Sequence, residues 1–148
     1  MVTDERVAQF KAVLRSIAAW AGAQDDIVAV ALVGSWARGA ARMSSDIDFV
    51  VLTSDKARYV ADDSWIRPAL GQKAELVRTA EWGPVTERRL RLSSGLEVDI
   101  GFVDPSWAAT DPVDPGTAGV VLDGCIPTVD PQAILDELVR AVMGRSSA

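Results

Sequence analysis

Hydrophobic residues follow two kinds of spacing along the chain, and each kind predicts a different element. Between Thr3 and Gly22 the apolar positions recur at helical intervals, and these two residues are suited to begin and end a helix. Residues 27–33 and 47–52 are instead continuous apolar runs of strand length, which is typical of buried strands. The buried stripe of the predicted helix consists of Val7, Phe10, Leu14, Ile17 and Ala21.

The second half of the chain begins with alternating patterns. Residues 85–92 and 96–103 predict a hairpin around a turn at 93–95. Alternation in the second arm gives one apolar face and puts Asp99 on the other, in the middle of an otherwise apolar strand. Residues 74–79 fit either a strand or the end of a helix, and the polar stretch 54–68 has room for a short helix.

The remaining segments are rich in proline and aspartate. Residues 104–119 contain two Asp-Pro pairs and are expected to form a loop. Residues 119–123 are expected to form a short edge strand. A last helix is expected to start at Pro131 under an Asp130 cap and to end at Gly144. Together these elements predict an α/β (α+β) fold, in which helices pack on a mixed central β-sheet.

Composition sets limits on this picture. The 148 residues make up one ordinary domain, expected to span residues 1–148, and their net charge is −6 at pH 7. An acidic surface argues against a nucleic-acid partner and against an anionic membrane. The single cysteine, Cys125, excludes an internal disulfide and favours a reducing compartment. Since the N-terminal residues lack the apolar core of a signal peptide, we expect a cytoplasmic protein.

The candidate chemistry rests on carboxylates, because the chain has no histidine. That absence excludes Ser-His-Asp and Cys-His nucleophiles and histidine-ligated zinc. Asp46 and Asp48 stand at the entrance of the second apolar run and point to the same side, because strand side chains alternate. Two such charges repel by about 4 kcal/mol at 4 Å and an effective dielectric of 20. A hard divalent cation such as Mg²⁺ would relieve this repulsion.

These residues carry a resemblance to a known family. Gly34 and Ser35 end the first apolar run, ten residues follow, and the sequence Asp46-Ile47-Asp48 then leads a second strand, with Asp99 in a later one. The pattern resembles the DNA polymerase beta-like nucleotidyltransferase superfamily. It is most similar to the small bacterial branch of minimal and aminoglycoside nucleotidyltransferases. The resemblance is dense over residues 33–52, looser over 97–103 and weak elsewhere.

The resemblance implies a function and a role for each residue. A helix would open at Gly34 and Ser35 and turn its amides and its dipole toward a triphosphate, with Arg38 and Ser45 also near the nucleotide. The Ala/Arg-rich composition after Ser35 agrees with a helix there. The three aspartates would hold two Mg²⁺ ions for in-line phosphoryl transfer, with Asp99 available as a general base. The implied reaction moves AMP from the substrate ATP to a hydroxyl or phosphate acceptor.

The acceptor does not follow from the resemblance. An aminoglycoside, another small molecule or a protein would each fit, and the missing part of an acceptor site would come from loops, a second copy or a helical partner protein. The alternative function is a catalytically weak nucleotidyltransferase-fold binding partner of a helical protein, similar to an antitoxin.

Structural explanations for the same residues stay open. Asp46 and Asp48 would be plain strand-entry carboxylates if they paired with Arg38 and Arg42. Asp99 would need no metal if it faced an arginine of the other hairpin arm, Arg89 or Arg91. Ser45 would then only cap a turn. Among the tryptophans, packing is expected for Trp20 and Trp36, and either packing or base stacking for Trp65, Trp82 and Trp107.

Overall fold

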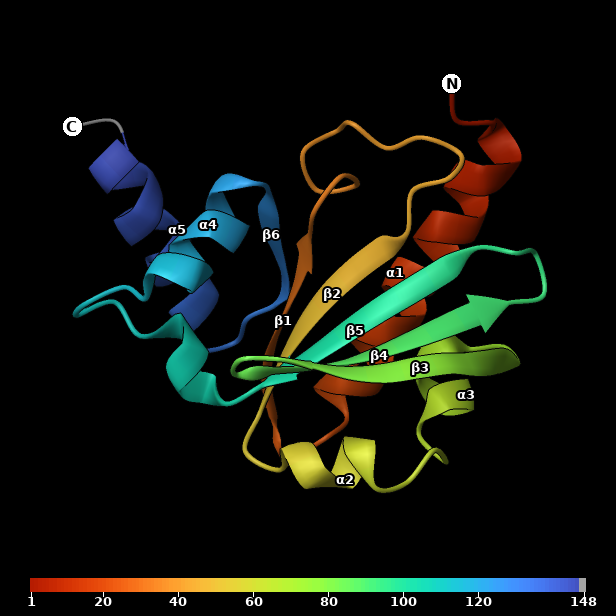
Figure 1. Cartoon of the computed structure of the whole chain (residues 1–148), viewed down its shortest axis with the longest axis horizontal. Helices are drawn as coiled ribbons and strands as arrows, with labels where there is room; N and C mark the ends of the chain where they lie inside the picture. The colour runs from red at the N-terminus through yellow and green to blue at the C-terminus, as the bar shows by residue number, and fades with distance from the viewer. Residues whose placement is uncertain (147–148) are drawn as a thin grey trace.

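A computed structural model describes residues 1–146 and contains a six-stranded mixed sheet (Figure 1). The strand order is β3-β4-β5-β2-β1-β6. β2 and β5 pair in parallel, and the other neighbours pair antiparallel. The strands are β1 (Ile27–Val33), β2 (Ile47–Thr53), β3 (Ala74–Trp82), β4 (Val85–Leu92), β5 (Glu97–Val103) and β6 (Cys125–Val129). The mixed α/β class predicted from the sequence is confirmed.

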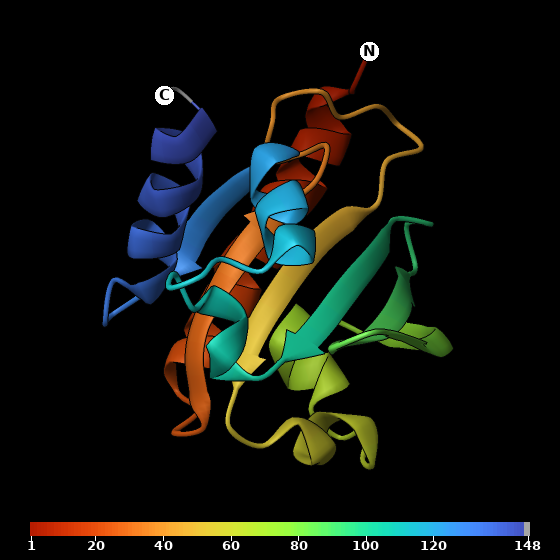
Figure 2. The ribbon, with the colours of Figure 1, turned by 60° about the vertical axis from the view of Figure 1, so that its left-hand side comes forward.

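Helices cover the two faces of the sheet unequally. α1 lies across one face, with α2 and α3 at its lower end, and buries the larger apolar core there (Figure 1). On the other face α4, α5 and a short 3₁₀ helix, η1, lie over β6, β1 and β2 (Figure 2). The helices are α1 (Asp4–Gly22), α2 (Lys56–Val60), α3 (Ile66–Leu70), η1 (Pro105–Ala108), α4 (Pro115–Leu122) and α5 (Ile134–Ser146).

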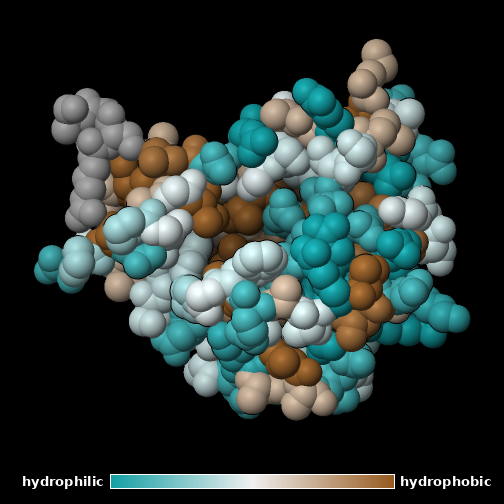
Figure 3. Space-filling model, in the orientation of Figure 1, coloured by the Kyte–Doolittle hydropathy of each residue, from teal (hydrophilic) through white to brown (hydrophobic). Residues whose placement is uncertain are grey.

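The part of the second face formed by β4 and β5 carries charged side chains. Glu87 and Arg89 are half-buried and Arg91 is exposed, whereas the alternate residues of β4 point into the core. Figure 3 shows the result as a band of hydrophilic atoms over the strands at the right of the molecule, beside a hollow lined by hydrophobic atoms. The candidate carboxylates lie on this open part of the sheet.

Local sequence signals explain where several elements begin. Thr3 caps α1 by accepting a hydrogen bond from the Arg6 amide at 3.1 Å, as predicted, and α1 ends at Gly22. The predicted hairpin is also present, with β4 and β5 joined by a turn at 93–95. Residues 74–79 belong to a strand, and the stretch 54–68 contains one short helix, α2, and the start of a second, α3.

Three predictions for the second half were wrong. The expected loop 104–119 contains η1 and α4, because Asp104 and Asp114 each cap a helix that begins with proline. Residues 119–123 therefore lie in or directly after α4, and the edge strand is β6. The last helix starts at Ile134, not at Pro131, and runs past Gly144 to Ser146.

Asp130 is still the cap of α5. Its carboxylate accepts hydrogen bonds from the amides of Leu135 and Asp136. Between cap and helix, Ala133 has a φ of +58°, which is outside the range of a right-handed helix. The helix therefore cannot begin before residue 134.

A fourth prediction, the helix after Ser35, was also wrong. Residues 35–39 form turns, bracketed by Gly34 at φ +76° and Gly39 at φ +72°. One helical turn forms, with the Arg38 amide bonded to the Gly34 carbonyl, before the left-handed conformation of Gly39 stops it. The backbone after β1 is thus a tight turn and not the start of a helix.

None of the helices within residues 1–146 is long and apolar enough to cross a membrane.

Candidate active site

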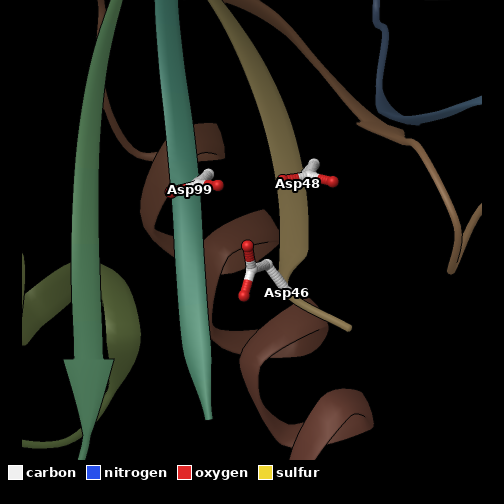
Figure 4. A group of neighbouring side chains, drawn as sticks. All are labelled: Asp46, Asp48 and Asp99. Atoms are coloured by element: carbon white, nitrogen blue, oxygen red, sulfur yellow. The ribbon is translucent and has the colours of Figure 1, made fainter. Parts of the chain in front are cut away.

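Strand pairing brings the three predicted aspartates together. Asp48 of β2 is directly opposite Asp99 of β5 in the parallel register, and Asp46 immediately precedes β2. Each of the three offers one carboxylate oxygen, and these oxygens all lie within 4.8 Å of one another. Figure 4 shows the three side chains beside one another at the adjacent ends of β2 and β5. Residues more than fifty positions apart in the sequence therefore form one acidic cluster.

The turn after β1 closes one side of this acidic cluster. A Cβ atom on Gly34 would lie 2.6 Å from Asp48 Oδ2, well inside contact distance. The positive φ of Gly34 is likewise a conformation that other residues rarely adopt. Glycine is therefore required at this position, because the backbone passes directly against the Asp48 carboxylate.

Arg89 of β4 is the cation closest to the acidic cluster. Its Nη2 lies 2.9 Å from Asp46 Oδ2 and 2.8 Å from Asp99 Oδ2. Its Nη1 lies 3.1 Å from Glu97 Oε1, and Glu97 also pairs with Arg91 at 2.9 Å. The expected alternative for Asp99, an arginine across the hairpin, is thus present. Glu97 was not singled out from the sequence, although it lies two residues before Asp99 on the same face of β5.

The electrostatics of the cluster differ from those of ordinary surface carboxylates. Burial, followed by the charge of Asp99 and a hydrogen bond shared with it, raises the pKa of Asp48 to about 7. Burial also raises the pKa of Asp99, assisted by Glu87 and opposed by Arg89. Asp48 forms no ion pair with an arginine in the described chain, so its charge is the least compensated of the three.

These features fit a hard divalent cation. Asp99 is 8% exposed, and its Oδ1 is buried with no hydrogen-bond partner, which leaves a free ligand oxygen inside the cluster. Carboxylate oxygens are the ligands that Mg²⁺ and similar ions prefer. Because the strand register and the Gly34 turn hold the ligands in place, the side chains need little rearrangement to bind such an ion.

The other predicted site residues lie around this centre with different contacts. Ser35 follows Gly34 in the turn and is half-buried. Arg38 Nη1 donates to the Asp123 carbonyl at 3.2 Å and forms no ion pair with Asp46 or Asp48. Ser45 Oγ accepts a hydrogen bond from the Arg42 amide at 2.8 Å, so this serine does stabilise a turn. The expected structural pairing of the two aspartates with Arg38 and Arg42 is therefore absent from the described chain.

A polar pocket of about 220 Å³ adjoins the acidic cluster. Asp46 and Glu97 form part of its wall, and Ser44, Ser45 and Arg91 supply further polar groups. This space is large enough for a small part of a ligand beside the carboxylates.

The tryptophans mainly pack. Trp36 stacks on Phe10 with ring centroids 4.2 Å apart, and Trp20 and Trp65 belong to the buried aromatic cluster around Tyr59. Trp107 is buried, and Trp82 is 59% exposed at the end of β3. Base stacking stays a prediction for Trp82 alone.

Comparisons with known proteins agree with this arrangement. Residues 14–107, more than half of the chain, match the family model described as a nucleotidyltransferase domain. A search of curated proteins found no match. Among solved structures, the fold is similar to a cytoplasmic RNA terminal U-transferase, with a TM-score of 0.53 and 17% identity over 82% of this chain and 33% of that one.

Two further solved structures match this chain. The Cid1 poly(U) polymerase with Mg 3′-dATP bound has a TM-score of 0.51 and 19% identity over 68% of this chain and 32% of that one. A toxin–antitoxin structure with AMP-PNP covers 95% of this chain and 86% of that one at 14% identity, but its TM-score of 0.41 supports no argument. This chain spans about a third of the first two proteins, and at these identities the likeness shows the fold alone.

Proposed function

Because the chain belongs to the nucleotidyltransferase domain family, we propose that it transfers a nucleoside monophosphate, AMP from ATP, to a hydroxyl or phosphate acceptor. The observation that carries this proposal is the convergence of Asp46, Asp48 and Asp99, whose oxygens lie within 4.8 Å of one another. Carboxylates grouped in this way hold the metal ions of two-metal sites for in-line phosphoryl transfer. When bound, Mg²⁺ would neutralise charge on the triphosphate and lower the pKa of the attacking hydroxyl.

In this proposal each residue has a separate task. Asp46 and Asp48 would hold two Mg²⁺ ions, and Asp99 would complete the metal site on the acceptor side. Asp99 would also take the acceptor's proton, a role supported by its buried, unpartnered Oδ1 and by the burial that raises the pKa of this carboxyl group. Gly34 lets the backbone approach the phosphates, while Ser35 donates its hydroxyl to one of them. Arg38 and Ser45 line the nucleotide side.

The absence of a helix after Ser35 changes how the phosphates would be held. Without a helix dipole, the amides of one tight turn supply the donors, and side chains supply the rest. We therefore expect nucleotide binding to depend more on the metal than it would in a protein with a long phosphate-facing helix.

We also propose that residues 1–148 form one nucleotidyltransferase domain. Two described elements beyond the matched range support this. β6 pairs with β1 in the same sheet, and α5 packs in the same core as η1 and α4. The acceptor would bind at the open face of β4 and β5 or in the pocket beside Asp46, or a partner such as a second copy or a helical protein would complete its site.

A titration tests the function directly. Purified protein is mixed with ATP, GTP, CTP or UTP, with and without Mg²⁺, and binding is measured by calorimetry. We expect Mg²⁺-dependent binding with ATP preferred. A labelled-nucleotide transfer screen over proteins, aminoglycosides and RNA then identifies the acceptor. A chain that binds no nucleotide in Mg²⁺ would be a binding partner with this fold and not an enzyme.

A further inference from the structure

Arg89 is in an unusual position for a strand residue. Its Nη2 contacts Asp46 Oδ2 and Asp99 Oδ2 at 2.9 and 2.8 Å, so a single nitrogen bridges two of the three carboxylates. The side chain is 22% exposed, and its Nε is buried with no hydrogen-bond partner. The guanidinium is therefore held through its two terminal nitrogens, while the stem nitrogen gains nothing from this position.

The charges around the site indicate what Arg89 does. When all are ionised, Asp46, Asp48, Asp99 and Glu97 bring four negative charges, and Arg89 and Arg91 bring two positive ones, which leaves −2. Without Arg89 the balance would be −3. Arginine keeps its charge at every physiological pH, so this compensation is permanent as long as the side chain stays in place.

The contacts also show that Arg89 has a second anchor. Its Nη1 lies 3.1 Å from Glu97 Oε1, outside the group of three aspartates. Rotation toward Glu97 would keep one ion pair and free the bridged oxygens of Asp46 and Asp99. A third arginine on this face, Arg78, pairs with Glu87 at 3.0 Å and is opposite Arg89 in the β3–β4 register.

We propose that Arg89 is a positioning residue that holds Asp46 and Asp99 together in the metal-free chain and competes with a divalent cation for their Oδ2 atoms. This inference rests on the proposed metal site. It adds that the chain carries its own counter-cation, and that this arginine must release Asp46 Oδ2 and Asp99 Oδ2 before a metal ion can bind these two atoms. The affinity for the cation is then weaker than the carboxylates alone would give.

The test is a calorimetric titration of the nucleotide-free full chain with Mg²⁺ alone, and with Mn²⁺ alone. Arg89→Gln removes the competing cation, so we expect it to bind either ion roughly tenfold more tightly than the wild-type chain. In metal-free buffer the same variant should melt at a lower temperature, and Mg²⁺ should raise its melting temperature by more than it raises that of the wild type. If Arg89 were purely structural, its replacement by glutamine would not tighten metal binding.

Arg78→Gln is the matched control, because it removes the same charge from the same sheet face without touching the acidic cluster. Its Mg²⁺ affinity should stay within about twofold of the wild type, since exposed charges are screened over short distances. If Arg89→Gln does not fold, Arg89→Lys is the second test. A lysine ammonium cannot reproduce the planar guanidinium that bridges the two carboxylates, so the Arg89→Lys chain should still bind the ions more tightly than the wild type.

The outcomes separate this inference from the proposed function. A wild-type chain and an Arg89→Gln chain that both bind neither ion would remove the metal site itself. A wild-type chain that binds Mg²⁺, with an Arg89→Gln variant of equal or weaker affinity, would overturn the role of Arg89 alone. Equal tightening in Arg78→Gln and Arg89→Gln would reduce the effect to general surface charge and would also overturn it.

Discussion

A single carboxylate, Asp26, and the acidic cluster lie at opposite ends of the β1–β2 pair, and their environments are opposite. Asp26 precedes β1, near the end of β2, whereas Asp46 and Asp48 stand at the start of β2. Asp26 accepts hydrogen bonds from Thr53 Oγ1 at 2.7 Å and Tyr59 Oη at 2.6 Å, and it also pairs with Arg58. All of these donors come from this chain, so Asp26 is fully occupied.

The pKa values respond in opposite directions. Burial tends to raise the pKa of Asp26, but the hydrogen bonds from Tyr59 and Thr53 outweigh it and hold that pKa below its ordinary value. In the acidic cluster, burial and the neighbouring charge raise the pKa of Asp48 to about 7. A carboxylate whose partners are supplied by the fold stabilises the fold, whereas carboxylates left with surplus charge and a free oxygen are suited to a ligand.

The largest expected effect comes from Asp48→Asn. We expect Mg²⁺-dependent nucleotide binding and transfer to fall by more than roughly 100-fold, because a direct ligand should matter at least as much as the outer partners of metal ligands. The metal-free variant should nevertheless melt at a higher temperature, since a repelling charge is gone. Calorimetry with Mg²⁺-ATP and thermal melts in chelator check both. Unchanged Mg²⁺-ATP affinity would contradict the metal assignment.

Asp26→Asn should have the reverse effect, with lower stability and unchanged nucleotide binding. We expect a loss of about 2 kcal/mol of unfolding free energy, because a half-buried carboxylate that accepts several hydrogen bonds is replaced by an amide that can accept fewer. Mg²⁺-dependent nucleotide binding should be unchanged. Urea unfolding measures the loss, and the exposed neighbour Asp25→Asn is the control, with an expected change within about 0.5 kcal/mol. Equal losses in the two variants would show that Asp26 contributes no more than a surface residue.

Stability as a function of pH sharpens the same contrast. The folded chain keeps a proton on Asp48 up to about pH 7, whereas the unfolded chain releases it near 3.8. The stability from this group is therefore full below pH 3.8 and is lost as the pH rises through 7. The contribution of Asp26 has the opposite sign, since its lowered pKa gives stability that is lost only as the pH falls below the ordinary range.

Thermal melts of the metal-free chain between pH 5 and 8 measure this dependence, and those pH values are chosen around the Asp48 pKa of about 7. We expect the wild-type melting temperature to fall with rising pH over this range and that of Asp48→Asn to change much less. Asp26→Asn should keep the wild-type slope, because Asp26 is ionised throughout. An Asp48→Asn chain with the wild-type slope would assign the titration to another group.

The sequence predicted the parts of this contrast that depend on local pattern. Alternation and apolar runs predicted β1, β2 and the β4–β5 hairpin, and the spacing of Asp46 and Asp48 predicted one shared face. That Asp99 joins Asp46 and Asp48 was expected only through the family resemblance, and the parallel pairing of β2 with β5 was not predicted, since no local signal encodes which strands become neighbours. The Asp26 site was not predicted, because Tyr59 lies in a polar stretch without a clear period.

Local chemistry was also misread in two places. The Asp-Pro signal was applied to residues 130–131 but not to 114–115, although Asp114 caps a helix that begins directly at Pro115, whereas α5 begins three residues after Pro131. The Ala/Arg-rich segment after Ser35 has good helix formers, yet the left-handed glycines at 34 and 39 override them. Helix propensity is a weak preference, and two positive φ angles five residues apart leave no room for a helix.

The smallest expected effects compare those two glycines. Gly34→Ala and Gly39→Ala each place a side chain at positive φ, which costs about 1 kcal/mol, so both should lower the unfolding free energy by a similar amount. Only at Gly34 does the new methyl group meet Asp48 Oδ2, at 2.6 Å, whereas nothing lies within 4 Å at Gly39. Gly34→Ala should therefore also weaken Mg²⁺ binding several-fold by displacing a ligand, and Gly39→Ala should not. Urea unfolding and Mg²⁺ calorimetry on both variants separate backbone strain from damage to the site, and equal Mg²⁺ affinities would mean that the Asp48 carboxylate moves aside without cost.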